Sequence, residues 1–401
     1  MQEDMKLKVD DKKLGARESY LRFPLWSQPV WTWLSGKPLS GEQPLLRPHP
    51  LLMMICTLSL LMVAVLIHLL LLEKGVSVSW AGFWLTPIFA MIVTGALRKI
   101  QVVYIHYCAH GAFIRNRQKL NQFIGNVLVT ITFVQDMAEY KREHFEHHKR
   151  TIFTTLRDAD AALLYRFGLR PGRTIRQLYL VLAWVLVSPV YHVYFLAARL
   201  RSNLLARRFF WRLLSVLWLV MLVWVLPSQL GISNVALAIW LPMVWGYQAS
   251  ALLQFLTEHV WLVSEEGPTK DESYAQRCIG RFCGEPLPEN GTFVTWIAWW
   301  LRTLLLHIPL RLSVLVGDLP AHDWHHLCGL VGHRPAQWPL AIFARQQAID
   351  AGNDQGMGQR ECWGLSQMLN HVFTSMAAAP ALNNQGSVPS SVPSVSSDSP
   401  T

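Results

Sequence analysis

The sequence EHFEHHKR, residues Glu143 to Arg150, places three histidines within five positions. His144, His147 and His148 lie at offsets of zero, three and four, which brings them to one face of a helix within one turn. Three neutral imidazoles that converge on one point suit a transition metal, whereas a hydrophobic core avoids them. This stretch therefore predicts a metal site carried by a helix.

Two further groups of histidines have related spacings: HYCAH at residues 106–110 and HDWHH at residues 322–326. A ninth histidine, His259, ends the sequence QFLTEH. A single HxxxH pair occurs by chance on many helices, but two HxxHH groups in the same chain indicate metal binding. The predicted metal ligands are His106, His110, His144, His147, His148, His259, His322, His325 and His326.

The other six histidines are expected to be structural. His68, His192 and His307 lie in apolar segments, where histidines form hydrogen bonds between helices. The remaining three are expected at the surface: His49, His333 and His371.

The composition indicates an integral membrane protein. Hydrophobic residues make up 52% of the 401 residues, and charged residues make up only 15%. The net charge of +10 comes from basic residues that lie between apolar segments, as in the cytoplasmic loops of membrane proteins. The six cysteines form no CxxC pair, which argues against a disulfide framework, a zinc knuckle or an iron–sulfur cluster. We therefore expect the lipid bilayer as a partner, and no nucleic acid.

Four apolar segments are predicted to span the membrane in two hairpins: residues 51–72, 76–97, 213–226 and 232–255. Spanning a bilayer takes about 20 predominantly apolar residues. Basic loops accumulate on the cytoplasmic side of membrane proteins, and in this arrangement every histidine group falls on that same side.

Three other apolar segments are expected to lie at the membrane interface. Residues 120–134 are too few for a span and suit a re-entrant or an interfacial helix. A span at residues 178–198 would turn the basic loop that follows it outward, against the positive-inside tendency. Residues 292–319 contain Arg302 and Arg311, which are costly in the middle of a bilayer.

The predicted fold is an all-α integral membrane protein with four transmembrane helices, interfacial helices and a cytoplasmic histidine-rich cap. The predicted divisions are a cytoplasmic N-terminal segment at 1–50, a membrane domain at 51–330, a cytoplasmic C-terminal segment at 331–376 and a disordered tail at 377–401. No cleavable signal peptide is expected. In either a bacterial inner membrane or the endoplasmic reticulum, the active site would face the cytoplasm.

The number of imidazoles indicates two metal ions. Nine are too many for one zinc, which takes four ligands. Imidazole binds zinc, copper, iron and nickel, so the ligand type alone does not choose among them. A redox-capable pair beside a lipid phase favours iron and the activation of dioxygen.

Together, the HxxxH, HxxHH and HxxHH groups resemble the membrane fatty acid desaturase superfamily over about residues 50–330. The sequence HYCAHGAFIRNRQKLNQFIGNVL, which starts at His106, is similar to the first histidine box of acyl-lipid desaturases. The resemblance implies a helical fold with a cytosolic cap and a non-haem di-iron centre held by the nine histidines. It also implies oxygen-dependent desaturation of a fatty acyl chain.

Two departures from the family pattern widen the expectations. Tyr107 stands where an acidic residue is usual, so another residue must accept the hydrogen bond of a ligand imidazole. The candidates for this role are Glu143, Glu146, Glu258 and Asp323. The sequence QFLTEHVWL also looks like an element of membrane alkane hydroxylases, which keeps open a hydroxylase or ketolase acting on an alkane, a sterol or a carotenoid.

Electrons must come from outside, because no flavin, haem or iron–sulfur motif is present. A separate donor of the ferredoxin or cytochrome type, with an acidic surface, would suit the basic cytoplasmic face. A histidine-rich metal transporter is a remote alternative. It would need polar residues along a path through the spans, and only His68 lies deep in one.

Overall fold

The computed structural model describes residues 15–75, 79–289, 291–328 and 340–382. Within this part the chain is mostly helical, and its two strands are three residues long each. The predicted helical class is therefore confirmed.

The first predicted hairpin consists of α3 (Pro50–Glu73) and α4 (Trp80–Lys99). His49 caps α3 by accepting a hydrogen bond from a backbone N–H, and Pro50 takes the first helical position, where an N–H is not needed. Gly75, with a φ of +73°, lies in the turn after α3, a conformation that glycine adopts without steric cost.

The helix α4 continues through a π-helical segment (Ile100–Ile105) into α5 (His106–Ala109). The apolar stretch Trp84–Ala109 is long enough to cross a membrane as a single helix. This span therefore leads directly to the first histidine group.

The second predicted hairpin is built from four helices joined by π-helical segments and a turn: α11 (Phe209–Val220), α12 (Leu226–Leu230), α13 (Ile232–Val235) and α14 (Tyr247–Glu258). Gly231, with a φ of +83°, turns the chain between α12 and α13. Because α14 ends at Glu258, His259 lies directly at the end of this hairpin.

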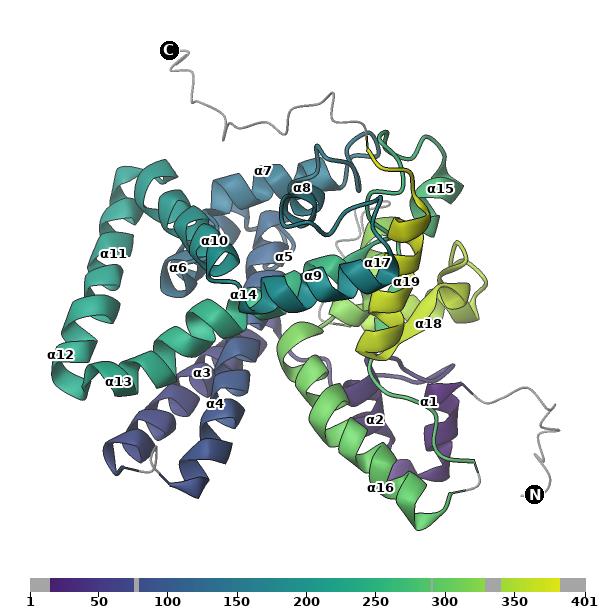
Figure 1. The fold of residues 1–401 in the computed structure, drawn as a ribbon, viewed down its shortest axis with the longest axis horizontal. Helices are drawn as coiled ribbons and strands as arrows, with labels where there is room; N and C mark the ends of the chain where they lie inside the picture. Colours follow the sequence, from purple (N-terminus) through teal and green to yellow (C-terminus); the bar gives the residue numbers. More distant parts are fainter. Residues whose placement is uncertain (1–14, 76–78, 290, 329–339, 383–401) are drawn as a thin grey trace.

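The histidine-bearing region is assembled from short helices: α6 (Gln118–Thr132), α7 (Met137–His147), α8 (Ala159–Arg166), α15 (Asp271–Gln276) and α17 (His322–Leu327). Asp136 starts α7 by accepting a hydrogen bond from the backbone N–H of Ala138 at 3.0 Å. In Figure 1, α7, α8 and α15 lie at the top, and the α3–α4 hairpin points to the bottom.

The C-terminal part of the chain packs against this region. β1 (Gly280–Phe282) pairs in parallel with β2 (Glu361–Trp363), which leads into α19 (Gly364–Ala378). The helix α18 (Ala341–Asp350) contacts α17. His333 and most of the predicted tail, residues 383–401, lie outside the described residues.

Among the described residues, five helical stretches are long and apolar enough to cross a membrane: Pro50–Glu73, Trp84–Ala109, Phe209–Leu230, Ile232–Glu258 and Phe293–Val314. Four of them correspond to the predicted spans. The fifth contains α16 (Phe293–Arg302), which was expected at the interface. In Figure 1, α16 extends to the same side as the α3–α4 hairpin. These stretches fit a multi-pass membrane protein, with one candidate span more than the four predicted.

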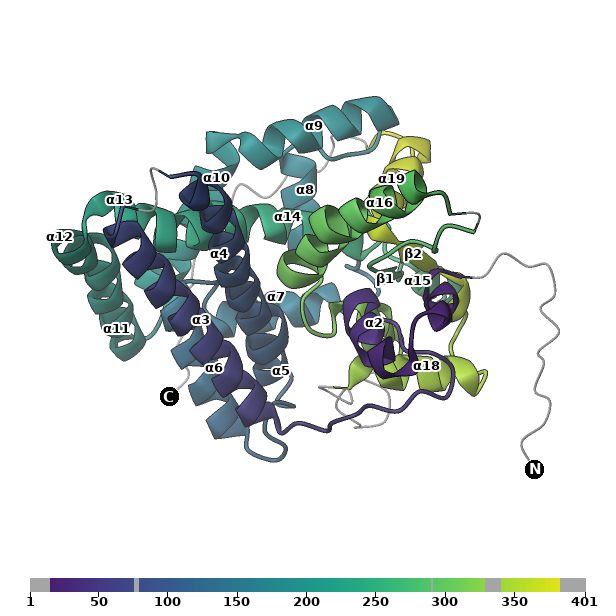
Figure 2. The ribbon, with the colours of Figure 1, turned by 90° about the horizontal axis from the view of Figure 1, so that it is seen from below.

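The N-terminal segment packs against α16. Figure 2 shows α2 (Gln28–Ser35) beside α16, and the rings of Trp31 and Trp299 lie 6.0 Å apart. Both arginines of the fifth stretch are satisfied within the protein. Arg302 pairs with Glu285 at 2.7 Å, and Arg311 donates hydrogen bonds to backbone carbonyls.

The apolar segment at residues 178–198 forms two helices, α9 (Ile175–Val187) and α10 (Pro189–Arg201), which are bent by 60° relative to each other. Pro189 has no backbone N–H to donate, so it cannot continue α9 but can start α10. By length and composition the pair fits either a broken span or a re-entrant segment.

Two of the apolar-segment histidines behave as expected. His68 lies 3.3 Å from the hydroxyl of Thr86, between α3 and α4, and His192 lies 2.7 Å from the side-chain oxygen of Gln248, between α10 and α14. His307 differs, because neither of its buried ring nitrogens has a hydrogen-bond partner among the described residues.

Candidate metal centre

All nine predicted ligands lie in one region, where four helical elements end close together. The first group lies on α5 and at its end, the middle group on α7 and at its end, and the third group on α17. His259 follows α14. The spacing of three and four residues puts the histidines of each group on one helical face, so every helix can present its rings inward.

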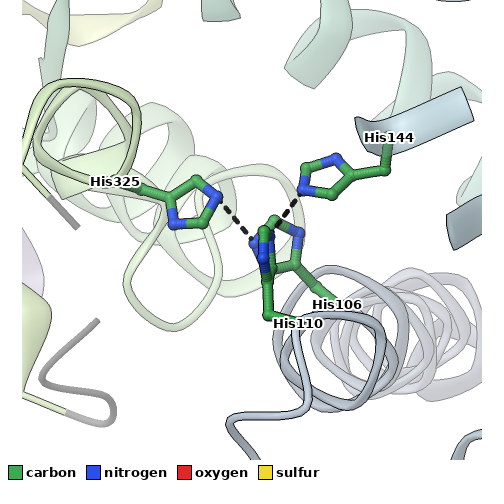
Figure 3. A group of neighbouring side chains, drawn as sticks. All are labelled: His106, His110, His144 and His325. Carbon is green, nitrogen blue, oxygen red and sulfur yellow. Dashed lines mark hydrogen bonds between the residues drawn. The ribbon is translucent and has the colours of Figure 1, made fainter. Parts of the chain in front are cut away.

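Five of the rings form the first position: His106, His110, His144, His148 and His325. Nε2 of His144 lies 2.8 Å from Nε2 of His110 and 3.0 Å from Nε2 of His148. Nε2 of His325 lies 3.1 Å from Nε2 of His106 and 3.2 Å from Nε2 of His148. Figure 3 shows four of these rings pointing toward one another: His106 and His110 from α5 and its end, His144 from α7 and His325 from α17. Five nitrogens therefore meet in a small space.

The other four rings form the second position: His147, His259, His322 and His326. One nitrogen of each lies within 4.8 Å of the others. Nε2 of His322 is 3.0 Å from Nε2 of His326. The ring of His148 stacks on that of His326, with centroids 4.2 Å apart, so the two positions are neighbours.

Three outer Nδ1 atoms each contact an oxygen of another side chain at 2.8 to 3.1 Å: His147 with Asp158, His106 with Tyr140, and His326 with Tyr274. An imidazole that donates its Nδ1–H outward presents the lone pair of Nε2 inward. These contacts therefore set the tautomer in which a ring can bind a metal.

Burial keeps most of these imidazoles neutral. It lowers the pKa of His110 to about 4, and it holds the pKa values of His148 and His259 well below the usual range. His147 differs: burial lowers its pKa, but the adjacent Asp158 carboxylate outweighs this effect and raises the pKa to about 9. The neutral ring is the form that binds a metal.

The donor set fits two metal ions. Both ring nitrogens of His259 are buried without a hydrogen-bond partner among the described residues, and a buried polar atom without a partner is costly. A metal at the second position would satisfy one of them. Imidazole-rich sites suit iron and, by ligand type, also zinc, copper and nickel.

A sequence profile of the family described as fatty acid desaturase matches residues 78–311. The chain belongs to the fatty acid desaturase family. This finding confirms the resemblance drawn from the histidine groups and indicates a membrane di-iron oxygenase. The match ends before the third histidine group, which the fold brings to the other two. No curated protein gave a significant match to the chain.

Of the four acidic residues expected to hold the outer nitrogens of this desaturase-family centre, only Glu258 contacts a ligand ring among the described residues. Its Oε1 lies 2.7 Å from Nε2 of His322. Glu143 instead accepts a hydrogen bond from a glutamine, and Asp323 is bound by Arg345. Glu143 and Asp323 thus bind side chains other than the ligand rings.

The acceptors that the sequence did not identify are Asp158, Tyr140 and Tyr274. Tyr140 lies one turn before His144 on α7, so its spacing in the sequence could have indicated that it lies beside the ligand rings. Asp158 precedes α8 and caps it, a position that does not indicate a contact with a ligand ring. Tyr274 comes from α15, and only the tertiary fold brings it to the third histidine group.

A cavity of about 90 Å³ adjoins both positions of this desaturase-family chain, with space for several water-sized molecules. His106 and His144 line it from the first position, and His147 and His322 line it from the second. The other polar residues in its wall are Gln101, Gln135, Tyr140, Glu143, Asp158, Asp160, Gln254 and Glu258. The cavity is therefore where a small reactant can reach both groups of rings.

Proposed function

We propose that the protein is a membrane-bound, non-haem di-iron oxygenase that introduces a double bond into a fatty acyl chain. The observation that carries this proposal is the convergence of nine imidazoles at two adjacent positions beside apolar helices long enough to span a membrane. Membership of the fatty acid desaturase family supports it. The substrates are a lipid or fatty acyl chain and dioxygen, and the electrons come from a separate protein.

Each position has its own set of proposed iron ligands. The first position is assigned to His106, His110, His144, His148 and His325. The second position is assigned to His147, His259, His322 and His326.

A bound iron pair would supply the reductive activation of dioxygen that an unactivated methylene requires. The balanced reaction takes two hydrogens from the acyl chain, with two electrons and two protons from outside, and converts dioxygen to two waters. The protein's part is to hold and orient the rings. Asp158, Tyr140 and Tyr274 fix three of them from behind, and burial keeps bulk water away from the second position.

The less buried edge of the first position suits electron delivery. His110, His144 and His148 are partly exposed, whereas the second position is fully buried. The ammonium of Lys141 lies 5.8 Å from the ring centre of Phe145, whose ring neighbours that of His110 at 5.1 Å. A basic edge attracts an acidic donor, which we propose to be a ferredoxin or a cytochrome on the cytoplasmic side.

Hydroxylation by the same centre is the second candidate, because QFLTEH resembles an element of alkane hydroxylases. Both reactions begin with the loss of one hydrogen and then differ in whether a second hydrogen leaves or an oxygen is added. Metal transport has less support, since His68 is engaged with Thr86 and stacks on Phe89.

Lipid analysis of a host of known lipid composition that expresses the chain tests this function. Desaturation predicts new species two hydrogens lighter, and hydroxylation predicts species one oxygen heavier. The His147→Ala variant should give neither. His371→Ala, which changes an exposed residue of α19, is the matched control and should keep the product. Unchanged lipids with an iron-loaded, correctly inserted protein would contradict the proposal.

A further inference from the structure

We propose that Glu258 is a metal ligand, and that its carboxylate supplies an oxygen donor to the second position. This inference rests on the proposed function, because it concerns the metal ions of the same centre. It makes the two positions chemically different: the first has nitrogen donors only, and the second has nitrogens and one anionic oxygen.

The location of the carboxylate oxygen carries the inference. Oε1 of Glu258 lies 2.7 Å from Nε2 of His322, and that same nitrogen lies 3.0 Å from Nε2 of His326. The outer Nδ1 of His326 contacts Tyr274, so its Nε2 faces the metal. The oxygen of Glu258 therefore meets His322 at the nitrogen that points into the second position.

This contact differs from those made by the other acceptors around the rings. Asp158 contacts Nδ1 of His147, and Tyr140 contacts Nδ1 of His106. Both acceptors lie behind their rings, where a side chain orients a ligand without binding the metal. Glu258 lies on the inner side, where donors lie.

The number of metal-donor atoms at the two positions also supports Glu258 as a ligand. Four rings meet at the first position, and Nε2 of His148 adds a fifth donor at 3.0 and 3.2 Å from two of them. Only four rings meet at the second. The Glu258 oxygen brings the donor atoms at the second position to five as well.

A hydrogen bond holds Oε2 of Glu258, whereas Oε1 faces His322 at 2.7 Å and Arg281 at 4.0 Å. Glu258 is 5% exposed and ends α14. Its Oε2 accepts a hydrogen bond from Nε2 of Gln254 at 2.6 Å, and the oxygen of Gln254 accepts one from Arg98. Arg281 is 4.0 Å from Oε1, beyond hydrogen-bond distance. A buried carboxylate needs a close positive partner, and a divalent metal beside His322 supplies it.

The competing explanation is that Glu258 only accepts a hydrogen bond from a protonated Nε2 of His322. Glu258→Gln separates the two roles. The amide oxygen of glutamine still accepts such a hydrogen bond, but it is a neutral and much weaker metal donor. A large change at the second iron is thus expected only if the carboxylate binds the metal.

The experiment loads the full-length protein with ⁵⁷Fe²⁺ without oxygen, and measures iron content and Mössbauer spectra. Wild type should hold two irons with two distinct signals. In Glu258→Gln, the signal of the second iron should shift or disappear while the first stays unchanged. Glu143→Gln, the same substitution in the wall of the same cavity, should leave both signals as in wild type.

Asp158→Asn shows how much the iron signal changes when a substitution acts on the metal only through a ligand ring, here His147. The change caused by Glu258→Gln should exceed that caused by Asp158→Asn. A Glu258→Gln spectrum equal to wild type, a change no larger than that of Asp158→Asn, or the loss of both irons would overturn the inference. A wild-type protein without two irons would instead contradict the proposed function.

Discussion

Nδ1 of His147 and Oδ2 of Asp158 lie 2.8 Å apart, and both side chains are buried. The carboxylate of Asp158 also accepts hydrogen bonds from the backbone N–H groups of Thr154 and Asp160. The carboxylate is therefore held by the start of α8 independently of the ring. This contact connects the middle histidine group to the loop that follows it.

Replacing Asp158 by asparagine should weaken iron binding at the second position. The charged acceptor that orients His147 becomes a neutral amide, and changes to such outer contacts typically lower metal affinity by about 10- to 100-fold. Anaerobic titration with Fe²⁺ at about pH 9, where proton competition at His147 is small in wild type as well, measures the affinity of each position. Asp271→Asn, which changes an exposed carboxylate on α15, is the control. Equal affinities in Asp158→Asn and wild type would show that the contact does not support the metal.

Iron binding at the two positions should respond differently to pH. Burial lowers the pKa of His147, but Asp158 outweighs this and raises it to about 9, whereas burial lowers the pKa of His110 to about 4. Only a neutral ring binds a metal. Below pH 9, iron can therefore bind at the second position only if His147 gives up its proton. Its affinity should rise by about tenfold per pH unit up to that value. Between pH 6.5 and 9 the first position should change little.

Competition with a chelator at several pH values measures this difference. Asp158→Asn should flatten the dependence at the second position, since the cause of the raised pKa is removed. The same pH dependence at both positions of wild type would contradict the assignment.

The sequence sufficed to locate four of the candidate spans and the three histidine groups that the fold brings together, because both signals are local. A long apolar run such as Pro50–Glu73 needs no knowledge of its neighbours, and a spacing of three and four fixes a helical face. The partners of the rings depend instead on tertiary contacts. Tyr274 reaches His326 across 52 positions of sequence, and no local pattern encodes that contact.

The prediction of an interfacial helix at residues 292–319 rested on two charges and stays a prediction. Arg302 and Arg311 suggested an interfacial helix, because an unpaired charge is costly in lipid. In the fold, Arg302 pairs with Glu285, and Arg311 donates to backbone carbonyls. Their charges are thus satisfied within the protein, and Phe293–Val314 remains long and apolar enough to be a candidate span.

The strand pair β1–β2 was not predicted, because strands of three residues show too little alternation of apolar and polar residues to be recognised in a sequence.

Arg345→Ala should destabilise the protein strongly. Arg345 is 2% exposed and bonds both carboxylate oxygens of Asp323, which is 1% exposed and lies within the third histidine group. Breaking a buried pair from one side typically costs about 3–5 kcal/mol. Thermal unfolding in detergent measures the loss. Arg302→Ala, which removes a half-exposed pair, should cost at most about 1 kcal/mol. Equal losses in the two variants would contradict this account.

Lys141→Glu should slow reduction by an acidic electron donor without changing iron content. The substitution reverses the charge beside Phe145, at the partly exposed edge of the first position. Stopped-flow reduction at low ionic strength measures the rate, and a small chemical reductant should act at the wild-type rate. Lys74→Glu, at the end of α3 distant from the histidines, is the control. Equal slowing in both variants would place the donor elsewhere.

The number of irons bound by the purified, anaerobically reconstituted chain tests the central claim most directly. The account predicts two irons in wild type. It predicts one in His147→Ala, because that ring belongs to the second position alone and the five rings of the first position remain. One iron or none in wild type, or two in His147→Ala, would contradict it.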